Sequence, residues 1–123
     1  MKDKVKNNLK AVRVVLDSDV IDTDITSVQN KLLSLTQVSG LCAESLSVAT
    51  MLLEQSRLKV LDRIKNETYP ASIMSKMIDA ECANELGLVK YADRLNSAIT
   101  HSIDGLRSVI SLYKEEMANN IKS

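Results

Sequence analysis

The segment that decides the fold is residues 25–66, ITSVQNKLLSLTQVSGLCAESLSVATMLLEQSRLKVLDRIKN. Its apolar side chains recur at a spacing near 3.5 residues, the repeat of an α-helix that packs against other helices. The segment contains no proline and one glycine, Gly40. The pattern therefore predicts a single helix over 25–66, a length typical of a coiled coil or a helical assembly rather than a compact globule. Its expected core positions include Leu32, Leu35, Leu46, Leu53 and Val60.

A second apolar edge widens the face of this predicted helix. It consists of Leu33, Leu41, Val48, Met51, Leu52, Leu58 and Leu61. A face of this width exceeds a two-stranded seam, so we expect more than one neighbouring helix. One helix returning from the same chain should not cover it, and the sequence therefore predicts a homo-oligomer.

The residues before this segment divide into a basic and an acidic part. Residues 1–16 place apolar side chains at steps of four, three and four, which predicts a short helix with one apolar face. The other faces of this helix are basic, with five Lys or Arg against one Asp. Residues 17–24, DSDVIDTD, predict an acidic linker, because Asp and Ser side chains compete for backbone hydrogen bonds inside a helix. We expect Asp22 or Asp24 to cap the long helix.

The chain reverses after the long helix. Pro70 disfavours a helical conformation at Tyr69 and is well placed to start a new helix. One or two returning helices are predicted over 71–118, with a break expected at Gly87. The expected core positions of the last helix share one arc, and they are Leu95, Ile99, Leu106, Ile110 and Tyr113.

Composition agrees with an all-α chain. The 123 residues suit one domain, and they include three glycines, one proline and neither Phe nor Trp. An all-β domain would need turn residues about every ten positions. We therefore expect residues 1–123 to form a single all-α domain, a long helical hairpin or bundle with coiled-coil-like packing that is oligomeric.

Several classes of function are disfavoured by the sequence. The net charge is zero, so the chain lacks the strong excess of Lys and Arg that marks many nucleic-acid-binding domains. No membrane span or signal peptide is visible, and a cytoplasmic location is expected, in the host cell if a phage encodes the protein. His101 is the single histidine, and Cys42 and Cys82 lie forty residues apart without metal-ligand spacing. We expect no enzyme activity, no cofactor and no metal site.

The main candidate for a binding surface is the basic stretch 57–65. Four cations lie within these nine residues, namely Arg57, Lys59, Arg63 and Lys65. They suit the C-terminal end of a helix, where cations interact favourably with the helix dipole. The alternative hypothesis is a set of phosphate contacts, which would add up when repeated around an oligomer.

Three stretches resemble the UvsY family of phage recombination mediators. Asp19-Val20-Ile21-Asp22 is similar to an Asp…Ile-Asp element of that family, and the long helix from Lys31 to Ile64 ends in Leu58-Lys59, similar to its Leu-Lys DNA-contact motif. Residues 91–114 resemble the C-terminal helix of the family, notably in Ile103-Asp104-Gly105-Leu106-Arg107-Ser108. The resemblance implies a ring-like homo-oligomer without a cofactor that contacts single-stranded DNA and a recombinase. It also implies that Lys59 contacts phosphate.

Two other functions fit the same sequence. The chain could be a structural or adaptor bundle whose partner is a virion component or a host factor. It could also be a small phage inhibitor or sponge that captures a component of host defence between the helices of an oligomer. Binding to an oligonucleotide with strong salt dependence would separate the recombination accessory from both.

Overall fold

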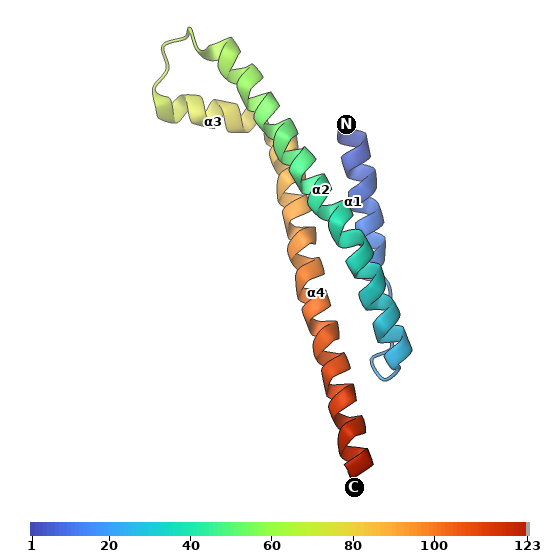
Figure 1. The fold of residues 1–123 in the computed structure, drawn as a ribbon. Coiled ribbons are helices and arrows are strands. Elements are labelled where there is room, and N and C mark those ends of the chain that lie inside the picture. The colour runs from blue at the N-terminus through green and yellow to red at the C-terminus, as the bar shows by residue number, and fades with distance from the viewer. Residues whose placement is uncertain (123) are drawn as a thin grey trace.

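The structure, a computed structural model, describes residues 1–122 apart from the side chain of Lys122. In this range the chain forms four helices and no strand, which confirms the all-α prediction. The helices are α1 (Lys2–Asp17), α2 (Ile25–Ile64), α3 (Ala71–Glu81) and α4 (Ala83–Lys122). Figure 1 shows α2 and α4 running antiparallel as two long rods, with α1 beside them at one end and α3 lying across the other end.

The core is a narrow aliphatic seam between α1, α2 and α4. Its fully buried members recur at helical spacing, and they include Val5, Leu9, Val12, Val28, Leu35, Cys42, Ala49, Ala92, Leu95 and Ile99. Burial of these side chains offsets the entropy of ordering two forty-residue helices, which side-chain propensity alone would leave marginal. The hydrophobic seam therefore holds the bundle together.

The second apolar edge of α2 has a neighbour within the same chain. The partly buried Val48 lies beside Val5 of α1, and Leu41 and Leu52 also pack against the core. Helix α2 therefore has more than one neighbouring helix, as expected, and α1 of the same chain is one of them. Four members of the edge remain exposed, namely Leu33, Met51, Leu58 and Leu61.

The connection between α1 and α2 is short and capped. The carboxylate of Asp24 accepts a hydrogen bond from the backbone N–H of Thr26 at 3.0 Å, so Asp24 is the N-cap of α2, as expected. The backbone N–H of Ile21 donates to the Ser27 hydroxyl at 3.0 Å. These two bonds fix the point at which the acidic linker enters the long helix.

The break in the returning segment is at Cys82 and not at Gly87. The backbone of Cys82 has φ −98° and ψ 18°, and the chain changes direction there between α3 and α4 (Figure 1). Gly87 lies inside the continuous helix α4, where glycine costs only about 1 kcal/mol relative to alanine. Two ion pairs, described below, join α3 to α2 on the N-terminal side of this break.

By length and composition α2 is also apolar enough to cross a membrane. One 18-residue window has a mean hydropathy of 1.2, and 22% of it is buried. The core helix of a soluble bundle satisfies the same criterion, and the buried side chains of α2 belong to the seam with α1 and α4.

Helix α4 extends beyond the other two long elements. Figure 1 shows its C-terminal turns continuing past the α1–α2 connection. The exposed fraction along the core stripe of α4 rises from 9% at Leu106 to 37% at Tyr113, 52% at Met117 and 83% at Ile121. We call residues 111–122 the α4 overhang. Ser111 and Lys114 at its start still line a groove with Gln29 and Leu32 of α2, and the apolar stripe continues past them to Ile121.

Candidate functional site

The basic stretch at the end of α2 is largely neutralised by neighbouring carboxylates. Arg57 contacts Glu54 at 3.0 Å and Asp79 of α3 at 3.7 Å, and Arg63 pairs with Glu81 of α3. The Glu81 carboxylate is the main cause of the raised pKa of Arg63.

Lys65 and Lys59 complete the predicted cluster. Lys65 pairs with Asp62 at 2.7 Å. Lys59 is exposed and has no ion pair among residues 1–122. Three of the four predicted phosphate contacts are therefore already engaged by carboxylates of this chain, and Lys59 alone is uncommitted.

The surface around these cations has mixed charge. An open groove of about 430 Å³ lies between α2 and α3, and Arg57, Leu58 and Leu61 line it together with Ser75 and Ile78. Two carboxylates, Glu54 and Asp79, line the same groove. Carboxylates facing a bound phosphate would repel it, so this groove is a poor anion site as it stands.

The predicted core positions separate into three groups. Five are buried, namely Leu35, Leu53, Leu95, Ile99 and Leu106. Four are half-buried, namely Leu32, Leu46, Val60 and Ile110. Tyr113 is exposed on the overhang, where its neighbours include Asp22 and Thr23 of the α1–α2 connection. The stripe was assigned to the correct face, and the end of the partner helix decides which members are covered.

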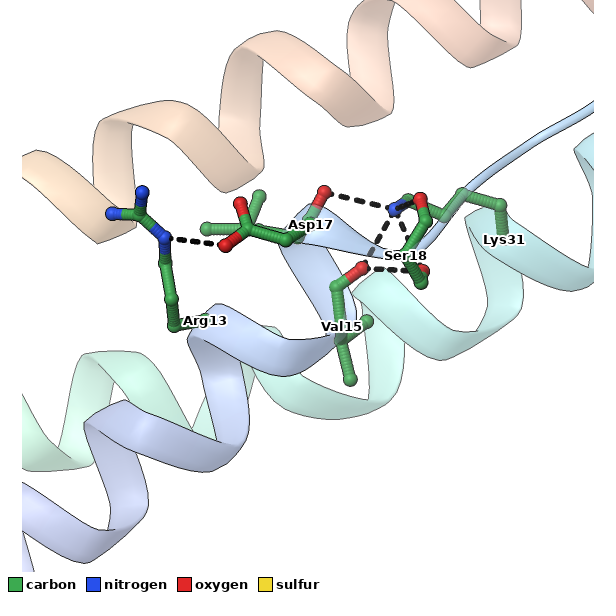
Figure 2. A network of polar contacts seen from close by, with 6 residues as sticks. Arg13, Val15, Asp17, Ser18 and Lys31 are labelled. Atoms are coloured by element: carbon green, nitrogen blue, oxygen red, sulfur yellow. Dashed lines mark hydrogen bonds and ion pairs between the residues drawn. The ribbon is translucent and has the colours of Figure 1, made fainter.

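The sequence-based predictions missed a buried cation at the end of α1. The ammonium of Lys31 on α2 donates to the carbonyl oxygens of Val15 at 2.6 Å and Leu16 at 2.9 Å, and to the Ser18 carbonyl (Figure 2). The Ser18 hydroxyl oxygen is 2.8 Å from the same ammonium. The last carbonyls of a helix have no partner within the helix, so Lys31 caps α1 from a different element.

Burial disfavours the charged form of Lys31 at this cap. Lys31 is only 9% exposed, and desolvation lowers its pKa, with the nearby Asp17 and Asp19 opposing that shift. Lys31 occupies a core-stripe position, three residues after Val28 and four before Leu35. A lysine among apolar core positions could have indicated a buried polar contact from the sequence. The carbonyl oxygens to which it donates can be identified only from the position of α1 in the structure.

The nucleophilic side chains are poorly placed for catalysis. Burial is the main cause of the raised pKa of both the Cys42 and the Cys82 thiol, which disfavours the reactive thiolate. His101 is exposed on α4, far along the chain from either cysteine. Within residues 1–122 no group of three or more His, Cys, Asp or Glu could hold a metal ion.

No protein-family model, curated protein or solved structure matches this chain. Hypotheses about its function therefore rest on its own surfaces. Two of these surfaces stand out, namely the apolar α4 overhang and the exposed cations that lack a carboxylate partner.

Proposed function

We propose that this chain is a non-enzymatic helical assembly protein that forms a homo-oligomer through the α4 overhang. The observation that carries the proposal is that the core stripe of α4 continues through Tyr113, Met117 and Ile121 with rising exposure, while the last turns of α4 run past the α1–α2 connection (Figure 1). A second copy would bury these side chains in the way that α2 buries Leu95 and Ile99.

Helix physics favours a partner for the overhang. The overhang extends a helix that is already nucleated, so each further residue adds one hydrogen bond, but without tertiary packing this gain is small and the helix end frays. Each buried large apolar side chain would contribute roughly 1.5 to 3 kcal/mol relative to its exposed state. A second copy that covers the stripe would therefore stabilise the overhang as well as joining the two chains.

Native mass measured against concentration tests this proposal. Wild type should be larger than a monomer at micromolar concentration, and Met117→Asp should lower the mass while helicity is retained. Asn119→Asp is the matched control, since it adds the same charge two residues away, on the opposite side of the helix. A monomeric wild type, or equal loss of mass in both variants, would refute assembly through this stripe.

A second candidate function is the binding of single-stranded DNA as a recombination accessory that also contacts a recombinase. The resemblance to phage recombination mediators supports it, and so do exposed cations that have no ion pair within residues 1–122. On α1 and α4 these include Lys6, Lys10, Lys90 and Arg94. In an oligomer each such cation is repeated, so a chain of zero net charge can still present a basic path.

Oligonucleotide binding tests this second candidate. A labelled single strand should bind wild type at about 50 mM salt, with an affinity that falls steeply as salt is raised. Failure of the oligonucleotide to bind at low salt would instead favour an adaptor whose partner is another protein, such as a virion component or a host factor.

A further inference from the structure

Some of the exposed cations that have no ion pair within residues 1–122 lie on α1 and α4, away from the α2–α3 groove. Lys2, Lys6, Lys10 and Arg13 follow one another at steps of four, four and three, so they share one edge of α1. Lys6 and Lys10 are exposed and have no ion pair within the described chain. The edge therefore presents free ammonium groups on a short, rigid element.

Two contacts show that this edge faces α4. Lys2 pairs with Glu85 near the start of α4. At the other end of the edge, Arg13 bonds to Asp17 at 2.8 Å, and both side chains point toward α4 in Figure 2. Asp17 is the main cause of the raised pKa of Arg13, and the hydroxyl of Tyr91 on α4 lies close enough to contribute. Lys6 and Lys10 lie between these two contacts.

Helix α4 adds an aromatic ring beside Arg13, and two more cations lie near that ring in the sequence. Tyr91 is 39% exposed, and Lys90 and Arg94 lie one residue before it and three residues after it. Both of these cations are exposed and unpaired within residues 1–122. Of the carboxylates near these residues, Asp17 and Glu85 are engaged by Arg13 and Lys2, whereas Asp3 of α1 and Asp93 of α4 have no ion pair within residues 1–122.

We propose that the α1–α4 seam binds single-stranded nucleic acid, with Lys6, Lys10 and Arg94 contacting phosphates and Tyr91 providing a stacking surface for a base. Cations that follow the backbone beside an exposed aromatic ring are the combination that single strands require. The inference rests on the single-strand-binding role proposed above, and it moves the contact surface from the end of α2 to the other side of the bundle.

Charge reversal with a matched control tests the location. Lys6→Glu with Lys10→Glu should weaken binding of a labelled oligo-dT by about tenfold or more at about 50 mM salt. Lys59→Glu with Arg63→Glu makes the same change of charge at the end of α2, and it should stay within about twofold of wild type. Circular dichroism and native mass should be unchanged in both variants.

The outcomes separate the location from the function. If the seam variant binds within about twofold of wild type, or if the α2 variant loses as much affinity, the seam is refuted while single-strand binding stands. If wild type does not bind at all, both proposals fall. Neutralisation by Lys6→Gln with Lys10→Gln should also reduce the slope of log affinity against log salt by about 1.4, the value for two single-strand phosphate contacts.

Tyrosine fluorescence tests the stacking contact. The chain has three tyrosines and no tryptophan, so Tyr69→Phe with Tyr113→Phe leaves Tyr91 as the sole emitter. Oligo-dT should quench this emission, and Tyr91→Ala should weaken binding about tenfold, whereas Tyr91→Phe should not. Tyr69→Ala is the control, since Tyr69 is similarly exposed in the α2–α3 connection. Unquenched emission, together with equal affinity for polyphosphate, would show a general polyanion surface and refute the assignment.

Discussion

Replacing Lys31 with Met isolates the contribution of the buried cation that caps α1. Met retains an unbranched apolar chain but loses the ammonium group, which donates to three carbonyl oxygens of α1 and the residue that follows it. Val15, Leu16 and Ser18 would then lose their only side-chain donor from α2. We expect the variant to fold with a less stable α1.

The magnitude follows from two opposing effects. Hydrogen bonds to a charged group contribute about 1.5 to 3 kcal/mol each, but water can replace those at the edge of the bundle. Burying the ammonium also costs free energy of desolvation, the same effect that lowers the pKa of Lys31, and the Met variant avoids this cost. The balance is a loss of about 2 kcal/mol, a large fraction of the roughly 5 to 15 kcal/mol that stabilises a typical domain.

Urea unfolding followed by circular dichroism measures this loss as a lower midpoint. Hydrogen exchange should locate it, with faster exchange of the α1 amides than of the central amides of α4. Lys59→Met is the matched control, because Lys59 is exposed and has no ion pair within residues 1–122, and it should change stability by less than about 0.5 kcal/mol. Equal midpoints for the two variants would show that desolvation cancels the cap, and the reasoning would be refuted.

Two further predictions concern α4. The hydrogen bond from Lys2 is the main cause of the lowered pKa of Glu85, so the stability that this pair contributes is complete above about pH 4.5 and is lost as the pH falls further. The melting temperatures of wild type and Glu85→Gln should therefore differ at pH 7 and converge in acid, whereas a constant difference would contradict this linkage. Gly87→Ala should raise the free energy of unfolding by roughly 0.5 to 1 kcal/mol, since an added Cβ meets nothing within 4 Å and Gly87 is helical. A loss of stability on urea titration would mean that another surface contacts Gly87.

Much of the fold could be predicted because the decisive signals are local. The spacing of Val28, Leu35, Cys42 and Leu53 identifies the buried face of α2 whatever its partner, since helix geometry alone aligns residues three and four apart. The N-cap at Asp24 is equally local, because the carboxylate bonds to a backbone N–H two residues away.

The charge of the candidate site depends on contacts between helices that are distant in sequence, so the sequence predicted it less well than it predicted the fold. Arg57 and Arg63 form a basic cluster in the sequence, but α3 folds back and places Asp79 and Glu81 against them. Arg63 and Glu81 are 18 residues apart, on α2 and α3, and the relative direction of these helices depends on the connection 65–70 between them. Charge counted along a segment therefore overestimated the free charge at its surface.

The sequence by itself determined that this chain is all-α, that its core is aliphatic and which faces of α2 and α4 are apolar, because the period of an α-helix is a property of the local backbone. Only the tertiary structure decided that α1 shares the core, that Lys31 caps α1 and that Tyr91 lies beside Arg13. It also decided where α2 ceases to cover α4 and leaves Met117 exposed. These features depend on the direction of each helix after its loop, and side-chain periodicity contains no information about that direction.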